Sequence, residues 1–157
     1  MRESGLRISD AATLSVDHIL ENRLRLQQTK TGEPVSMLLP DDVVKTLKAL
    51  PRTSPKYYFW TGESRITSTT GFWRAKIADV FKKAKVVGGH PHRFRDSFAV
   101  SLLQEGVSIE NVSKLLGHSS ITVTQKHYAP WVKTRQDALD KDILRVHALR
   151  PKKGRSK

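Results

Sequence analysis

Residues 90–131 read HPHRFRDSFAVSLLQEGVSIENVSKLLGHSSITVTQKHYAPW, with apolar side chains three and four positions apart. This spacing is typical of amphipathic helices, and turn residues divide the segment into several of them. The first helix is expected to pass through Phe94 and to stop at Gly106. Ser108 is placed to cap a second helix, and Gly117 ends it, since glycine is a common helix terminator.

The helical pattern continues toward the C-terminus. A third helix is expected to begin near Ser119 and to run toward Tyr128. Pro130 is expected to break it, because proline lacks a backbone donor and clashes with the preceding turn. Residues 134–149 predict a separate amphipathic helix, either folded back on its own domain or docked on a neighbouring copy. The basic residues 150–157 are expected to form a disordered tail.

The first half of the chain contains the expected strands. Residues 23–39 alternate apolar and polar side chains around a Thr29-Lys30-Thr31-Gly32-Glu33 turn, which predicts a β-hairpin. A loop with one short buried strand is expected around residues 57–60. Helices are expected over residues 8–14, from Asp41 or Asp42 to residue 50, and from Ser68 or Thr69 to residue 85. The sequence thus predicts a mostly helical α+β domain with a small antiparallel sheet near its N-terminal end.

Composition and charge restrict the class of protein. The chain has 157 residues, 38% hydrophobic and 27% charged, which suits one globular domain. Lys and Arg total 28 against 15 for Asp and Glu, a net charge of +13. That surplus favours a polyanionic partner, nucleic acid first and an anionic membrane surface second. Cysteine is absent, which excludes disulfides and cysteine-ligated zinc. Neither a signal peptide nor a membrane-spanning segment is evident, so we expect a cytoplasmic protein.

Three polar features in the second half could carry chemistry. His92 and Arg95 project from the same side of one helical turn and supply a proton-transfer group and a bidentate phosphate clamp. His118 supplies another hydrogen-bonding imidazole. Tyr128 can be a nucleophile toward phosphorus where nearby cations favour its phenolate. Each feature alone is a weak signal, since solvated surfaces and packing tyrosines are common.

Taken together and in order, these features resemble a known family. The relevant motifs are Gly5-Leu6-Arg7, Thr29-Lys30-Thr31-Gly32, His92-x-x-Arg95, Leu116-Gly117-His118 and Tyr128. Their order and approximate spacing are similar to those of tyrosine recombinases, the phage-integrase type of site-specific recombinase, over about residues 4–132. The resemblance implies a catalytic domain that cleaves and rejoins double-stranded DNA through a covalent 3′-phosphotyrosine, with no cofactor and no metal.

The resemblance assigns four residues to the scissile phosphate. Arg7 and Arg95 match the two arginines that grip its oxygens and stabilise charge in the transition state. His118 matches a position held by histidine or tryptophan, a hydrogen-bond donor to the phosphate. Asp10, three residues after Arg7, would hold that arginine by a charge-assisted hydrogen bond.

The remaining roles concern protons and the nucleophile. Tyr128 matches the nucleophile, and His92 matches the histidine that accepts or relays its proton. Lys30 matches the mobile lysine that acts as general acid for the departing 5′-oxygen. Lys45 and Lys48 are alternatives to Lys30, and only the Thr-Lys-Thr-Gly match separates them.

Several other residues have a structural and a functional interpretation. His90 and His127 flank the site, but their spacing is a poor one for metal ligands, so no metal is expected. The pair Asp41-Asp42 is better explained as a helix cap. The aromatic residues Trp60, Trp73 and 57–59 are more often core than a base-stacking platform. Contacts to DNA are expected from the basic residues Arg74, Lys76, Lys82, Lys83, Lys85 and Arg93.

Two other functions fit the same residues: a topoisomerase IB-like enzyme that relaxes DNA, and a non-catalytic DNA-binding remnant. Tyrosine recombinases usually carry a DNA-clamping domain ahead of the catalytic one, so residues 1–149 are interpreted as an N-terminally truncated catalytic domain. The full-length protein is expected to be bacterial or phage-encoded, nucleoid-associated, and to assemble as a tetramer on DNA.

Overall fold

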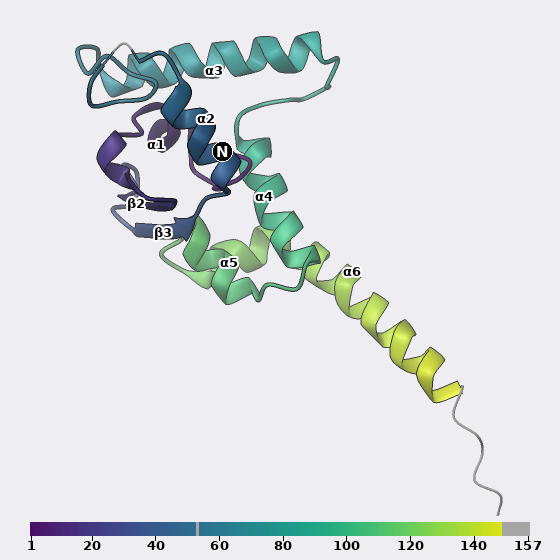
Figure 1. Ribbon diagram of the computed structural model, residues 1–157. Helices are drawn as coiled ribbons and strands as arrows, with labels where there is room; N and C mark the ends of the chain where they lie inside the picture. Colours follow the sequence, from purple (N-terminus) through teal and green to yellow (C-terminus); the bar gives the residue numbers. More distant parts are fainter. Residues whose placement is uncertain (53, 149–157) are drawn as a thin grey trace, which may run out of the picture.

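The computed structural model describes residues 1–52 and 54–148 (Figure 1). The predicted tail, residues 150–157, lies outside the described residues. The fold is mostly helical with a small antiparallel sheet in its first half, as predicted. Its elements are α1 (Ile8–Ala12), a 3-10 turn (Val16–His18), β1 (Ile19–Leu20), β2 (Arg23–Gln27), β3 (Pro34–Leu38), α2 (Asp41–Ala49), α3 (Ile66–Lys83), α4 (His92–Gln104), α5 (Ile109–Leu116) and α6 (Ile121–Ala148).

The sheet is an antiparallel meander in the order β1-β2-β3. Leu24 pairs with Met37 and Leu26 with Val35, so all four apolar side chains lie on one buried face while their neighbours face outward. The predicted hairpin is therefore confirmed. Its buried face packs with apolar residues of α1 and α2 to form the first hydrophobic cluster.

A second hydrophobic cluster joins α4, α5 and α6, and it contains Tyr128. Phe98 packs against both clusters. Gly5 has φ +59°, and a Cβ built on it would lie 2.6 Å from the Phe98 ring and 2.9 Å from Leu116. Only glycine allows this approach, so the N-terminal turn lies directly on α4 and α5 and brings Arg7 toward the second half of the chain.

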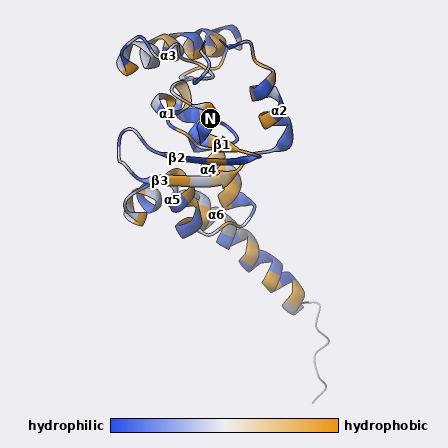
Figure 2. Ribbon diagram, turned by 60° about the vertical axis from the view of Figure 1, so that its left-hand side comes forward, coloured by the Kyte–Doolittle hydropathy of each residue, from blue (hydrophilic) through white to orange (hydrophobic). Residues whose placement is uncertain are grey.

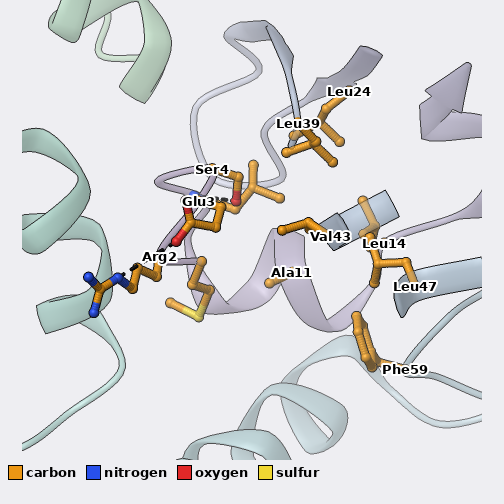
Figure 3. Close-up of a pocket in the computed structure, with 12 residues that line it drawn as sticks. Arg2, Glu3, Ser4, Ala11, Leu14, Leu24, Leu39, Val43, Leu47 and Phe59 are labelled. Carbon is orange, nitrogen blue, oxygen red and sulfur yellow. Dashed lines mark hydrogen bonds and ion pairs between the residues drawn. The ribbon is translucent and has the colours of Figure 1, made fainter. Parts of the chain in front are cut away.

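The first cluster is not completely filled. A cavity of about 260 Å³ lies beside the N-terminal turn. Its apolar lining residues include Ala11, Leu14 and Val43 (Figure 3). Arg2 and Glu3 form an exposed ion pair of 3.6 Å at its edge. The cavity is part of the packing between α1, α2 and the sheet.

The end of the chain differs from the prediction. Pro130 does not break the helix: α6 runs without interruption from Ile121 to Ala148. Proline removes one hydrogen bond of the ladder and strains one turn, and the helix continues on both sides of that turn. The part after Trp131 projects away from the domain with orange and blue residues alternating on it (Figure 2). Of the two expected arrangements, folding back on the same domain is not observed, and Leu139, Ile143 and Leu144 are exposed.

Three local boundaries also differ. The helix expected to open at Ser68 or Thr69 begins at Ile66, because Arg65 is extended and its carbonyl already accepts from the amides of residues 68 and 69. Pro40, rather than Asp41 or Asp42, is the N-cap of α2; the two carboxylates lie in its first turn. The short strand expected at residues 57–60 is reduced to a single bridge between Ser15 and Tyr57.

The described residues contain no helix that is long and apolar enough to span a membrane.

Candidate active site

Arg7 stands directly before α1 and is held by the hairpin. One of its Nη atoms donates to Oε1 of Gln28, which also accepts from the Thr31 hydroxyl. Gln28 is 2% exposed, and its Nε2 donates to the carbonyl of Leu116 at the end of α5 over 2.7 Å. Burial lowers the pKa of Arg7, and the nearby Asp10 carboxylate opposes that shift. Gln28 therefore connects Arg7, the hairpin tip and α5.

Arg95 lies on α4 and is 1% exposed. Its Nη1 donates to the Gly5 carbonyl and its Nη2 to the Leu116 carbonyl, so it ties the N-terminal turn to α4 and α5. Its Nε is buried and has no hydrogen-bond partner among the described residues. Burial and the neighbouring Arg7 lower its pKa to about 10, so it remains a cation at neutral pH with an N–H left to donate.

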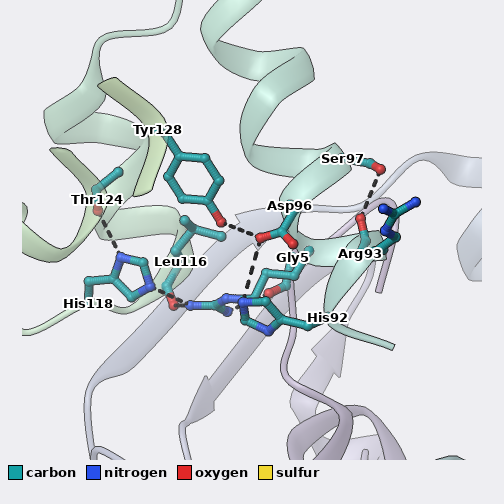
Figure 4. A network of polar contacts seen from close by, with 10 residues as sticks. Gly5, His92, Arg93, Asp96, Ser97, Leu116, His118, Thr124 and Tyr128 are labelled. Atoms are coloured by element: carbon teal, nitrogen blue, oxygen red, sulfur yellow. Dashed lines mark hydrogen bonds and ion pairs between the residues drawn. The ribbon is translucent and has the colours of Figure 1, made fainter. Parts of the chain in front are cut away.

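His118 follows Gly117 and contacts Arg95. Its Nε2 lies 3.0 Å from Nη2 of Arg95, and its Nδ1 lies 2.7 Å from the Thr124 hydroxyl (Figure 4). Arginine only donates, so Nε2 accepts and Nδ1 carries the proton. Burial and the Arg95 charge lower the pKa of His118 to about 4, which keeps the ring neutral. In this arrangement His118 accepts from Arg95, whereas the sequence predicted a donor to phosphate.

Tyr128 extends from α6 toward α4 (Figure 4). Its hydroxyl donates to Oδ1 of Asp96 over 2.8 Å, and that same oxygen lies 3.5 Å from Nε2 of His92, one turn earlier on α4. Burial and the hydrogen bond to Asp96 raise the pKa of Tyr128. Burial also lowers the pKa of His92, although the Asp96 charge opposes that shift. His92 and Tyr128 are thus joined through Asp96.

A basic cavity lies beside this network. Its volume is about 580 Å³, and the residues that line it include Arg7, Lys30, Arg74, His90 and His92. The cavity is wide enough for several water molecules or an anionic group, and its charge is positive. The structure therefore brings Lys30 and Arg7 together with His92 at one opening.

The alternatives to Lys30 are separate from it in the fold. Lys30 follows β2 in the turn of the hairpin, whereas Lys45 and Lys48 lie on α2. Of these three lysines, Lys30 lines the basic cavity.

Asp10 has a different contact from the expected one. Its Oδ1 accepts a 2.9 Å hydrogen bond from the amide of Thr29, and its Oδ2 is buried without a partner among the described residues. Within the described part of the chain no ion pair joins it to Arg7, so the predicted hydrogen bond is replaced by a longer-range attraction. Asp10 fixes the hairpin tip immediately before Lys30.

The predicted DNA-binding residues are more dispersed. Arg74 lines the basic cavity, while Lys76 lies over the Phe72 ring and Lys83 pairs with Asp79 at 2.9 Å. Arg93 lies on the other side of α4 from Tyr128 (Figure 4). The other two, Lys82 and Lys85, are exposed at the end of α3 and just after it.

The aromatic residues form a partly buried cluster, with the indole of Trp73 donating to the Phe59 carbonyl and Tyr58 buried. In the described residues no group of three His, Asp or Glu side chains could hold a metal ion.

Sequence reasoning missed Gln28, Asp96 and Thr124. A signal existed for Asp96, which is four residues after His92 on the same helix and therefore on its face. Gln28 contacts Arg7 and Leu116, which are 21 and 88 residues away in the sequence, and no local pattern marks it. Thr124 contacts His118, six residues earlier, across a turn whose geometry the sequence pattern does not give.

Comparison with known proteins identifies the family of this chain. The family model described as "Phage integrase family" matches residues 1–134. A curated tyrosine recombinase of Thermosipho africanus is 32% identical over 127 residues, covering 77% of this chain and 44% of that protein. This chain thus spans about half the length of the curated relatives it matches.

Solved structures share the fold. The XerA recombinase structure has a TM-score of 0.67 and 23% identity, covering 96% of this chain and 56% of that one. The post-cleavage complex of the XerH site-specific recombinase with its difH substrate has a TM-score of 0.68 and 19% identity, covering 88% and 42%. On the family model and the shared fold, the chain belongs to the phage integrase family.

Proposed function

We propose that this chain is the catalytic domain of a site-specific DNA recombinase, and that it cleaves and rejoins double-stranded DNA through a covalent 3′-phosphotyrosine at Tyr128. The observation that carries the proposal is the gathering of two hydrogen-bonded groups beside a basic cavity: Tyr128 and His92 meet at Asp96, and Arg95 contacts His118. Curated relatives described as tyrosine recombinases support it.

The proposed chemistry begins with charge. A phosphodiester is an anion that repels nucleophiles, so cations must surround it before attack. Arg95 has an unused N–H, and Arg7 faces the cavity; together they receive the phosphate oxygens. His118 contacts Nη2 of Arg95, so its ring lies next to the proposed phosphate position and turns toward the phosphate when DNA binds.

The covalent step exchanges one phosphoester for another. Oη of Tyr128 attacks phosphorus, the bond from phosphorus to the 5′-oxygen breaks, and Lys30 gives that oxygen a proton. Because the phosphotyrosine conserves the bond energy, the reverse reaction joins a 5′-hydroxyl to the strand. A 5′-hydroxyl from a second duplex gives recombination.

A topoisomerase IB-like activity uses the same chemistry but rejoins the original strand. The Leu-Gly-His and Thr-Lys-Thr-Gly motifs and the family match favour the recombinase. A non-catalytic remnant is disfavoured because all six candidate catalytic residues are present.

The test is covalent capture on a nicked suicide duplex, whose short 5′-fragment diffuses away after cleavage. The wild-type chain is expected to give a protein–DNA band that survives denaturation. Tyr128→Phe should lose the band and keep its affinity for DNA, since a chain of charge +13 retains its phosphate contacts. The absence of the wild-type band, with DNA still bound, would leave only a DNA-binding role.

The same assay examines Lys30. The loss of cleavage in Lys30→Ala should be overcome by a DNA substrate with a bridging phosphorothiolate at the cleavage site, because its sulfur leaving group needs no proton. Equal recovery in His92→Ala would place the general acid elsewhere.

Self-assembly is part of the proposal. The exposed apolar residues of α6 beyond Trp131, among them Leu139 and Leu144, support docking on a neighbouring copy and a tetramer on DNA in the full-length protein. We place the protein in the cytoplasm at the nucleoid, because DNA is the proposed substrate.

A further inference from the structure

Asp96 is a carboxylate inside the site to which neither the sequence nor the family resemblance assigns a role. It follows Arg95 on α4, and its side chain is 41% exposed. Its Oδ1 receives the Tyr128 hydroxyl at 2.8 Å and lies 3.5 Å from Nε2 of His92 (Figure 4). A single oxygen therefore separates the nucleophile from the histidine expected to take its proton.

In this arrangement the first group that the Tyr128 proton meets is Asp96, and not His92 as the resemblance implies. The hydroxyl proton of Tyr128 points at the carboxylate, which is an acceptor without rearrangement. We propose that Asp96 is the group that receives the phenol proton as Tyr128 attacks phosphorus, with His92 as the next group beyond it. The inference rests on the cleavage activity proposed above.

The step balances with groups already present. The bond from Oη to phosphorus forms as the phenol proton moves to Oδ1 of Asp96. The bond from phosphorus to the 5′-oxygen breaks, its electron pair stays on oxygen, and Lys30 supplies the proton there. In rejoining, Asp96 returns the proton to the departing phenolate, as microscopic reversibility requires.

A base in contact with Tyr128 is needed because the residue is 4% exposed and its pKa is raised, so free phenolate is scarce at neutral pH. Asp96 is the acceptor already in contact with the hydroxyl. The other charged and titratable groups that act on this site lie on several elements: His92 and Arg95 on α4, His90 just before it, Arg7 and Asp10 from the first turns of the chain, His118 after α5 and His127 on α6.

The experiment compares Asp96→Asn with wild type in single-turnover cleavage of the suicide duplex across pH. Asparagine keeps an oxygen that accepts from Tyr128 but cannot take a proton. We expect cleavage to slow by about 10²-fold or more, the scale of one general base, and to recover roughly tenfold per pH unit as phenolate forms. DNA affinity should be unchanged, and Asp96→Glu should restore much of the rate. Glu105→Gln, at the exposed far end of α4, is the matched charge control.

A second measurement does not depend on cleavage. Ultraviolet titration of tyrosinate, with Tyr128→Phe to assign the signal, should give a lower Tyr128 pKa in Asp96→Asn, because the carboxylate no longer stabilises the phenol. An unchanged Tyr128 pKa overturns the contact, and with it the proposal. Cleavage by Asp96→Asn at the wild-type rate and with the wild-type pH profile overturns the base. A wild-type chain that binds DNA but never cleaves it overturns the proposed function itself.

Discussion

Replacement of Gly117 by alanine tests how the site is packed. Gly117 ends α5 at φ +59°, and a Cβ there would lie 2.7 Å from Cδ and Nε2 of Gln28 and 2.8 Å from Cγ2 of Val35. Both neighbours are 2% exposed, so relieving the contact requires buried side chains to shift. The left-handed backbone costs an alanine about 1–2 kcal/mol, and overpacking adds about 1–3 kcal/mol. We expect Gly117→Ala to lower the free energy of unfolding by about 2–5 kcal/mol in sum.

Gly32→Ala is the matched control. Gly32 has φ +69°, but nothing lies within 4 Å of its Cβ position, so only the backbone cost of about 1–2 kcal/mol applies. Urea unfolding followed by tryptophan fluorescence measures both variants. In a Gln28→Ala background, the cost of Gly117→Ala should fall but stay above that of Gly32→Ala, because one clashing side chain is gone and Val35 remains. Equal costs for the two glycine variants in the wild-type background would refute the close packing of Gln28 on Gly117.

The remaining predictions concern charge, pH and assembly. Arg95→Ala should abolish cleavage and also lower the free energy of unfolding by about 2 kcal/mol or more, because the Gly5 carbonyl loses its donor and the Leu116 carbonyl keeps only Gln28; Arg7→Ala should slow cleavage about 10²-fold or more with a smaller effect on unfolding. If the two variants unfold alike, the structural role of Arg95 is wrong. The folded-state pKa of His118, about 4, lies below the unfolded value of about 6.5, so the unfolded chain binds the extra proton and stability falls as pH drops from about 6.5 to about 4. His118→Gln should flatten that part of the urea-stability profile, and a profile as steep as that of wild type would contradict the shift. Leu139→Asp should shift any dimer seen by light scattering to monomer and leave the melting temperature of the monomer unchanged, since Leu139 is 43% exposed; a lower melting temperature would instead indicate packing within one chain.

The sequence was sufficient for elements whose signals are local. The Ser108 side chain accepts from the Asn111 amide and Gly117 adopts the left-handed conformation, so α5 begins and ends where its caps predict. The hairpin likewise follows from alternation around a glycine-containing turn. Pro130 misled the prediction because it alters a single turn, and the residues after it continue the helix.

The contacts within the site could not be read in this way. Gln28 reaches a carbonyl 88 residues away, Arg95 one that is 90 residues away, and Tyr128 a carboxylate 32 residues away. Such pairs depend on how α4, α5 and the N-terminal turn pack together, which periodicity does not encode. The family resemblance named the candidate catalytic residues. The structure adds two residues that contact them, Asp96 and Gln28.

The most direct test of the account identifies the amino acid that carries the DNA. The covalent product from the suicide duplex can be digested with protease and nuclease and the modified peptide sequenced by mass spectrometry. We expect a nucleotide remnant esterified to Tyr128 through its 3′-phosphate. A remnant on Tyr57, on Tyr58 or on a residue other than tyrosine would contradict it.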